Sequence, residues 1–575
     1  QVFVQVYEGK NMQEVSGIIK NAKYDNITGE YRKTKPEIFL HPMSKWYLHS
    51  EFENGVISGG RIELVWLFGL IGVFTLLLAC INFMNLATAR SMKRSKEVGI
   101  RKTIGSLRQQ LIFQFFGESL LVVVLSFLVA LGVTVLLLPF FNELTDKTMI
   151  FPWANTYFWG LALLFILITA IISGSYPALY LSSFKPSRVL KGTLGNNKGT
   201  GNLRKALVVF QFAISIALIV ATITVYNQIQ YAKERAVGYN VENLIYVPIN
   251  TAGVIEKFEP LREELLSSGA IEEVAASDVR ITGTFTTNSG FDWKGKDPGM
   301  SEEFRTLRAT HGYGEMVDWE IKEGRDFSRQ FKSDSLAFIL NETAVRYMGF
   351  ENPVGEIIRW GDNGLYKVVG VVKDMVTTSP FDQVRPSLYI LHYGRFLNMV
   401  NIKIADKSDM KSALAHIEKV FKKYDPKSLF SYNFFEDDYQ GKFIQEERIG
   451  TLASLFAALA ILISCLGIFG LSAFMAEQRT KELGVRKVLG ASMYNLLGLL
   501  TKDFFILVIV ACCIAIPTGL YYMDNWLQKY EYRTVVEWWV PVLTIFVILS
   551  ITLITISFQT VKASLTNPVK SLRTE

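Results

Sequence analysis

The sequence is poor in charged residues, cysteine and histidine. Only 20% of its 575 residues are charged, whereas 50% are hydrophobic, and a soluble protein would carry about a quarter charged residues. A wholly soluble protein is therefore disfavoured, and the aromatic content of 13% excludes a disordered chain. Each of the four cysteines lies inside an apolar run, at Cys80, Cys465, Cys512 and Cys513. This placement predicts no disulfide framework and no zinc site.

The motifs of common nucleotide-binding and catalytic sites are also missing. The chain has no GxxxxGK[ST] segment, whose amides and lysine would hold ATP phosphates, and no HExxH or GxSxG segment. The glycine-rich stretch 192–201 lacks the GK[ST] ending and is typical of a flexible linker. His311, His392 and His416 are scattered. We therefore expect no catalytic residue, no metal site and no cofactor bound by this chain, and we identify no substrate-binding residues.

Seven long apolar runs dominate what the sequence does contain. A helix of about 20 apolar residues crosses a bilayer, and such runs are too long for the core strands of a soluble protein. The runs cover roughly 64–89, 112–138, 158–181, 206–227, 449–475, 504–523 and 540–560. We therefore predict a polytopic protein that contacts the lipid bilayer through seven helices.

The placement of charge predicts which connections lie in the cytoplasm. Lysine and arginine concentrate in cytoplasmic loops, and aromatic residues gather at membrane–water interfaces. Twenty basic residues and only four acidic ones fall in segments 90–110, 182–205, 476–495 and 561–575. The connections 141–157 and 524–539 are aromatic instead and are predicted to lie at the outer interface. This topology predicts a membrane protein with large domains outside the cytoplasm. It also accounts for the net charge of +7, so no nucleic-acid partner is expected.

An internal repeat relates the two halves of the chain. Residues 94–106 read RSKEVGIRKTIGS and residues 479–491 read RTKELGVRKVLGA, with seven of thirteen positions identical. At the same offset, Asn82, Asn85 and Glu118 align with Gly467, Gly470 and Asp503. The asparagines and glycines favour close helix packing. Two interpretations of the membrane-interface acids Glu118 and Asp503 stay open: a contact with another helix or partner, or a carboxylate that snorkels toward basic neighbours.

The repeat extends into the residues before the first span. Residues 2–12 resemble residues 400–410, and both read as an alternating strand followed by the start of a helix. Residues 1–63 are therefore expected to be the C-terminal part of a first outer domain. Completing the repeat predicts roughly 200 residues before Gln1, which would include a leading span and the beginning of this outer domain.

The fold class and domain order follow from these patterns. We predict an α-helical polytopic membrane protein with extracytoplasmic mixed α/β domains, built from two tandem repeats of one span, an outer domain and three spans, with the first span missing here. The predicted segments are 1–63 (first outer domain, C-terminal part), 64–181 (three-span unit 1), 182–205 (cytoplasmic linker), 206–228 (opening helix of repeat 2), 229–448 (second outer domain), 449–560 (three-span unit 2) and 561–575 (cytoplasmic tail). Within 229–448, strands are predicted at 244–248, 336–340 and 366–372, and helices at 255–267, 342–348 and 410–423.

Two short charged segments give the strongest functional signal. Residues 96–101 and 481–486 each follow one span and precede another. A lipid anchor would need lysine and arginine but no particular order of acid, glycine and base. Because Glu97 recurs as Glu482, a protein partner is favoured over lipid headgroups. The glycines of these segments are expected to end or kink short helices.

At these residues the sequence resembles the FtsX/MacB-type ABC transporter permease family. The similarity lies in residues 94–105 and 479–490, in the NPVKSLR ending at 567–573, and in the order of one span, a large outer domain and three spans. It covers essentially the whole chain and points to the longer members with two fused halves. The resemblance implies that the ATPase-coupling residues are Glu97, Gly99, Arg101, Lys102, Gly105, Arg108, Glu482, Gly484, Arg486, Lys487 and Gly490.

The resemblance also implies a location in the bacterial inner membrane and a function. A separate ABC ATPase subunit, in two copies per chain, would bind ATP, and its motion would pass through the spans to the outer domain, a process called mechanotransmission. The expected result is efflux or extraction of an amphiphile, such as an antimicrobial peptide, a macrolide or a lipoprotein. The alternative is a regulatory relay that controls an extracytoplasmic partner such as a cell-wall hydrolase. By this resemblance the chain is a permease and not itself an enzyme. A periplasmic or outer-membrane protein is a further candidate partner.

Overall fold

The computed structural model describes residues 3–27, 35–53, 55–182, 198–297, 300, 303–478, 482, 485–486, 489 and 492–564. The chain forms two compact units. One contains the membrane helices, and the other contains the outer residues Ile229–Gln445 together with Gln1–Glu63 and the short segment Tyr530–Arg533.

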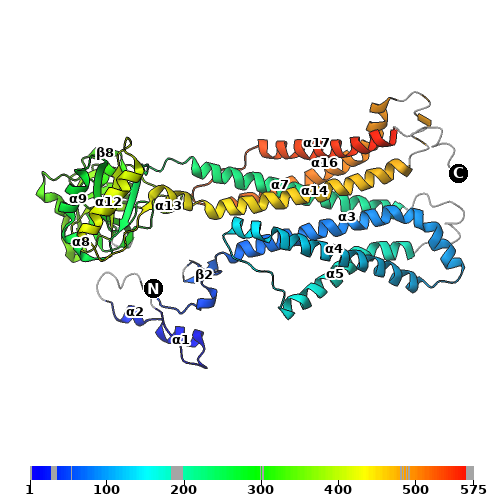
Figure 1. Ribbon diagram of the computed structural model, residues 1–575, viewed down its shortest axis with the longest axis horizontal. Helices are drawn as coiled ribbons and strands as arrows, with labels where there is room; N and C mark the ends of the chain where they lie inside the picture. The colour runs from blue at the N-terminus through cyan, green and yellow to red at the C-terminus, as the bar shows by residue number, and fades with distance from the viewer. Residues whose placement is uncertain are drawn as a thin grey trace. The chain divides into compact units, whose positions relative to one another are not determined.

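Among the residues that the structure describes, seven helices are each long and apolar enough to cross a membrane. They are α3 (Ile62–Thr103), α4 (Arg108–Thr145), α5 (Thr156–Ser182), α7 (Lys198–Lys233), α14 (Ile444–Gln478), α16 (Met493–Leu527) and α17 (Trp539–Ser564) (Figure 1). The seven predicted spans are confirmed. α4 packs against α5, and α16 packs against α17.

The two halves of the repeat meet inside the membrane unit. Leu78 of α3 is buried with Ile214 of α7 and Ala460 of α14. A Cβ atom on Gly467 of α14 would lie 3.1 Å from Oδ1 of Asn82, the residue with which the repeat aligns it. One turn further, a Cβ atom on Gly470 would lie 2.1 Å from Cδ2 of Leu86. The predicted close packing at these positions is therefore confirmed, and α3 and α14 approach each other at aligned positions, as expected beside a pseudo-two-fold axis.

Polar side chains line the same contact. Oγ of Ser215 on α7 lies 2.9 Å from Oγ of Ser464 on α14, and Nε2 of Gln211 donates to the carbonyl of Ile463 at 3.5 Å. Oδ1 of Asn82 is buried and has no hydrogen-bond partner among the described residues. We call Asn82, Gln211, Ser215 and Ser464 the polar seam. Such groups hold helices together in a membrane because the alternative is a polar atom in hydrocarbon.

A twelve-stranded mixed sheet forms the outer domain. Its strands are β3 (Leu244–Pro248), β4 (Ile271–Ser277), β5 (Thr286–Asn288), β6 (Phe291–Trp293), β7 (Phe304–Ala309), β8 (Ile321–Gly324), β9 (Ala337–Asn341), β10 (Ile357–Trp360), β11 (Leu365–Val372), β12 (Ser387–Leu391), β13 (Met399–Ile404) and β14 (Asn433–Phe434). The main order is β14-β3-β13-β4-β7-β12-β9-β11-β10-β6, with β5 beside β7 and β8 beside β11. β12 runs parallel to β7, and β11 runs parallel to β9.

Helices cover this sheet. They are α8 (Ala252–Glu256), α9 (Phe258–Leu266), α10 (Tyr313–Val317), α11 (Glu342–Met348), α12 (Met410–Tyr424) and α13 (Phe435–Gly441), with 3-10 turns at Lys332–Leu336 and Gly361–Asn363. One core packs α9 and α12 against β3, β4 and β13, with Leu261 and Ile417 fully buried. The predicted elements at 244–248, 366–372, 342–348 and 410–423 are confirmed. The single helix predicted at 255–267 is wrong, because Lys257, with φ of −113° and ψ of 25°, separates α8 from α9.

The outer segment before α3 contains little regular structure. It holds α1 (Met12–Ile19), α2 (Ala22–Asp25), a 3-10 turn at Met43–Lys45 and a hairpin of β1 (Glu51–Glu53) and β2 (Val56–Gly59). The alternating strand expected at the start of residues 2–12 is wrong, because the described residues 3–11 form no strand. Its counterpart β13 lies between β3 and β4 and bonds to both. An alternating pattern needs such neighbours before it becomes a strand.

A buried carboxyl makes the outer domain sensitive to pH. Burial raises the pKa of Asp326 to about 6, although the indole of Trp319 and the amide of Phe327 donate to it at 3.0 and 2.6 Å. Because the folded pKa exceeds the unfolded value, the domain loses stability as pH rises from about 4 to about 6, by roughly 3 kcal/mol. We expect Asp326→Asn to be more stable than the wild type at pH 8 and equal to it at about pH 3, below the unfolded pKa. Hydrogen exchange of residues 319–327 in the full chain measures the difference, and an equal gain at both pH values would contradict it.

Candidate functional site

The first charged segment forms the end of α3 and the turn into α4. Gly105 follows the helix with φ of +102°, a conformation that favours glycine. α4 then begins at Arg108. The prediction that Gly105 ends a helix is confirmed. Gly99, by contrast, lies inside α3 and ends no short helix, because α3 continues unbroken to Thr103.

An exposed ion pair lies on this turn. Glu97 and Arg101 approach within 2.7 Å, and their side chains are 53% and 43% exposed. Arg101 also donates to Oε1 of Gln114 on α4 at 2.7 Å, and Nε2 of Gln114 donates to Glu118 at 3.2 Å. An exposed pair four residues apart stabilises a helix by only about 0.3–0.5 kcal/mol. The pair therefore costs little to rearrange and leaves both charges accessible to a partner.

Two further cations tie the turn to α5. Nζ of Lys102 donates to the carbonyl of Ser182 at 2.6 Å, and Nε of Arg108 lies 3.4 Å from Oγ of the same residue. Burial and the neighbouring Arg108 lower the pKa of Lys102. Both side chains therefore hold the turn against the end of α5.

Two aliphatic side chains on the turn are exposed although they lie beyond the span. Ile100 is 49% exposed and Ile104 is 80% exposed, whereas Val98 is buried with Leu111 and Phe115. Exposed aliphatic groups flanked by charges are typical of a surface that docks on another protein. We call Glu97, Ile100, Arg101 and Ile104 the first cytoplasmic tip.

The second repeat presents the same pattern. Glu482 and Arg486 approach within 2.8 Å, while Val485 is 48% exposed and Leu489 is 79% exposed. These four residues, the second cytoplasmic tip, are the ones that the repeat aligns with the first tip. The remaining predicted residues of this segment, Gly484, Lys487 and Gly490, lie outside the residues that the structure describes.

Sequence reasoning missed the aliphatic members of both tips. The signal was present, because each pair is spaced four residues apart and is apolar in both repeats within an otherwise charged stretch. That spacing places the two side chains on one helix face.

The aligned acids Glu118 and Asp503 lie deeper, each ten residues from the start of its helix. A helix rises about 1.5 Å per residue, which puts them about 15 Å along α4 and α16. Glu118 accepts its hydrogen bond from Gln114, which in turn binds Arg101 of the first tip. A polar connection therefore runs from the first tip into the membrane helix.

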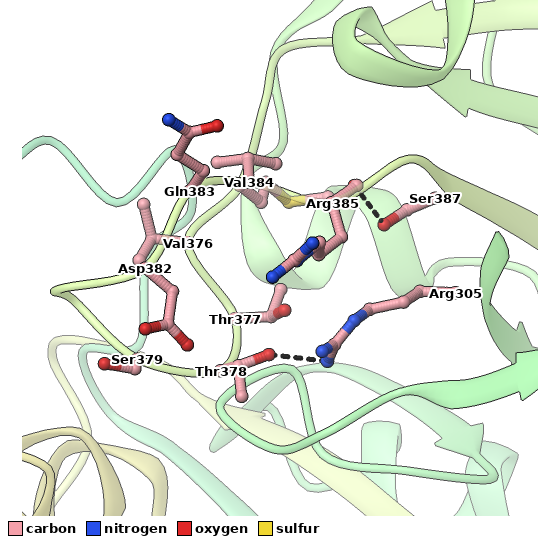
Figure 2. A pocket seen from close by; sticks show the side chains of 11 residues that line it. Arg305, Val376, Thr377, Thr378, Ser379, Asp382, Gln383, Val384, Arg385 and Ser387 are labelled. Carbon is pink, nitrogen blue, oxygen red and sulfur yellow. Dashed lines mark hydrogen bonds between the residues drawn. The ribbon is translucent and has the colours of Figure 1, made fainter. Parts of the chain in front are cut away.

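The described part of the outer domain contains no metal-binding cluster of histidine, cysteine and acidic residues. A pocket between Arg305 of β7 and the loop before β12 has a volume of only about 20 Å³ (Figure 2). That volume holds about one water molecule. Nη1 of Arg305 donates to Oγ1 of Thr378 across it at 2.7 Å. This pocket is too small for an amphiphilic substrate.

Comparison with known families gives two kinds of match. The FtsX-like permease C-terminal model matches twice, at residues 69–186 and 454–568. The MacB-like periplasmic core domain model matches residues 206–420. Together the matches extend over most of the chain.

Curated relatives are macrolide export ATP-binding/permease proteins named MacB. The protein from Bdellovibrio bacteriovorus is 21% identical over 403 residues, which cover 67% of this chain and 60% of that protein. The protein from Mannheimia succiniciproducens is 24% identical over 220 residues, which cover 36% of this chain and 33% of that protein. The chain thus spans less than two thirds of the length of these relatives.

The similarity to solved structures is weaker than the similarity to the family models. The periplasmic region of MacB from Actinobacillus actinomycetemcomitans is 17% identical, with a TM-score of 0.27, and the match covers 36% of this chain and 96% of that one. The extracellular domain of the noncanonic ABC-type transporter YknZ from Gram-positive bacteria is 16% identical, with a TM-score of 0.24, and covers 33% and 96%.

Three findings agree on what kind of protein this is. Seven helices are able to span a membrane, the permease model matches both three-span units, and the periplasmic core model matches the segment between them. The chain is a multi-pass inner-membrane protein with a periplasmic domain. It belongs to the FtsX/MacB-type ABC transporter permease family.

Proposed function

We propose that this chain is the permease subunit of an ABC transporter and that its two cytoplasmic tips receive the motion of an ATPase subunit. The observation that carries the proposal is the match between the tips. In each, an exposed ion pair stands beside two exposed aliphatic side chains. An apolar patch rimmed by charge suits a protein groove better than a lipid headgroup, which needs basic charge alone.

Two tips on one chain favour two ATPase copies per chain. ATP would be bound by those partners, since the sequence of this chain contains no GxxxxGK[ST] segment. The tips are not identical, because Leu107, which is 64% exposed next to the first tip, aligns with Ser492 next to the second. The first site would therefore bury more apolar surface and bind its ATPase copy more tightly.

The names of the relatives support a substrate class. The relatives are named for macrolide export, which supports an amphiphile, and the same reasoning extends to antimicrobial peptides and lipoproteins. ATP hydrolysis in the cytoplasm would drive efflux or extraction by moving the outer domain, with α7 and α14 as its covalent connections. Catalytic groups are not required for such work.

The first test is affinity purification of the chain from native membranes in mild detergent. We expect a P-loop ATPase to co-purify at about two copies per chain. An intact helical bundle without any ATPase would contradict the proposed function and leave a membrane scaffold or sensor.

A further inference from the structure

Three stretches of chain beside the spans meet on one loop of the outer domain. The loop consists of residues 376–385, which connect β11 to β12, and we call it the clasp loop. The stretches are the end of α7, the residues just before α14, and Tyr530–Arg533, a part of the connection between α16 and α17. Tyr530–Arg533, which we call the link segment, belongs to the same compact unit as Ile229–Gln445.

Backbone groups join the link segment to the clasp loop. The amide of Tyr532 donates to the carbonyl of Phe381 at 2.8 Å. The amide of Gln383 donates to Oε2 of Glu531 at 2.8 Å, and Arg385 approaches the same carboxylate within 3.4 Å. Gln383 and Glu531 are 148 residues apart in sequence. The contact is therefore a tertiary one that no covalent neighbour imposes.

Arg235, just after α7, touches both partners of this contact. Its Nη1 donates to the carbonyls of Pro380 and Asp382, each at 2.7 Å. Its guanidinium also lies 4.0 Å from the ring centroid of Tyr532, and Tyr231 of α7 stacks on that ring at 4.7 Å. Hydrogen bonds from a charged donor and cation–π contacts are both stronger than neutral contacts of the same size.

Phe381 lies at the centre of the contacts between the clasp loop and the three stretches. Its side chain is only 4% exposed and packs with Ala232 of α7. Its ring lies 5.2 Å from that of Tyr530 and 6.0 Å from that of Phe443, next to the start of α14. Nζ of Lys442 donates to the carbonyl of Thr377. One aromatic side chain thus contacts all three stretches that lead to the membrane helices.

The clasp loop packs closely against Arg305 of β7. Figure 2 shows Arg305 reaching across to Thr378 on the inner side of the loop. The space left between them is about 20 Å³, room for about one water molecule. The loop is therefore not a lid over a binding cavity, and its contacts serve to hold the link segment.

We propose that the clasp loop and the link segment form a non-covalent joint through which movement of α16 and α17 reaches the outer domain. α7 and α14 are continuous with that domain, whereas the connection between α16 and α17 contains the link segment, which belongs to the same compact unit as the domain. Arg235 is a positioning residue that fastens α7, the clasp loop and Tyr532 together. The inference rests on the proposed function, because it assigns a path for the motion that an ATPase partner supplies.

Hydrogen exchange of the full chain in nanodiscs, with its ATPase partner, tests the joint. We compare the wild type with Arg235→Ala, with Glu531→Ala, whose side chain is exposed and unimportant for the core, and with Arg395→Ala, an exposed arginine on another loop, as the matched control. Without nucleotide, the first two variants should raise exchange in residues 376–385 and 530–533 about tenfold, since each loses hydrogen bonds to a charged group. The control should not.

Addition of ATP and vanadate then tests the joint and the proposed function separately. We expect the wild type to change exchange both at the tips and in the outer domain, and the two joint variants to keep the first change and lose the second. A normal response of the outer domain in both variants, or unaltered exchange at 376–385 without nucleotide, would overturn the joint. A wild type without any ATP response at the tips would instead overturn the proposed function.

Discussion

Reversing the charge of Glu97 and Glu482 together is expected to abolish stimulation of the ATPase partner and to reduce its co-purification at least tenfold. Both residues form exposed pairs with Arg101 and Arg486, and such pairs contribute only about 0.3–0.5 kcal/mol to the helix. Loss of the pairs alone would therefore leave the fold intact. A large effect must come from charges placed against a partner, where a like-charge contact costs several kcal/mol. The measurement is the amount of ATPase bound per chain and its rate of ATP hydrolysis.

A charge-swapped control separates the two roles of each glutamate. In Glu97→Arg/Arg101→Glu, the ion pair within the helix is restored in the opposite order, but the surface seen by a partner is reversed. If the glutamates only stabilise their helices, the swap recovers ATPase binding and the partner role is wrong. If they contact the ATPase, the swap stays defective while thermal stability returns to that of the wild type.

Substituting Gly470 by leucine should force the two three-span units apart and lower stability by roughly 3 kcal/mol, the upper end of the usual cost of overpacking. Even a Cβ atom there would lie 2.1 Å from Leu86, and a full side chain has no space at the contact between α3 and α14. The measurement is the temperature at which the detergent-purified chain loses its monodisperse form. Gly132→Leu is the matched control, because nothing lies within 4 Å of a Cβ at Gly132.

A second, compensating substitution tests whether the two side chains oppose each other directly. Leu86→Ala should remove the side chain that Gly470→Leu meets, so the double variant should recover most of the lost stability although each single variant is destabilised. Additive losses in the double variant would mean that the two residues do not oppose each other, and the contact between the halves would then be wrong.

The membrane helices could be predicted from sequence because their signal is local. A run of about 20 apolar residues predicts a membrane span whatever the rest of the chain contains. The internal repeat was likewise enough to align Asn82 with Gly467. The strand expected at the start of residues 2–12 is wrong for the opposite reason. Its alternation matches that of β13, but β13 owes its conformation to the strands on both sides of it.

The site could be predicted in part. Charged residues in repeated order identified both segments of interest, whereas the exposed Ile104 and Leu489 were hidden by their resemblance to ordinary helix residues. The contacts of Arg235 with Pro380 and Asp382 span about 145 residues of sequence, and no local pattern reports them. Such contacts arise only once the chain has folded, so the periodicity of the sequence cannot predict them.

During synthesis α7 enters the membrane long before α14 exists. Between the two the ribosome must make, and the cell must export, the whole of Ile229–Gln445. Until α14 arrives, Gln211 and Ser215 lack the Ile463 carbonyl and the Ser464 hydroxyl that they bind in the finished bundle. Polar groups left in hydrocarbon are costly. This face of α7 is therefore less stable in hydrocarbon before α14 packs against it than in the finished bundle, although Ser215 keeps its hydrogen bond to the carbonyl of Gln211.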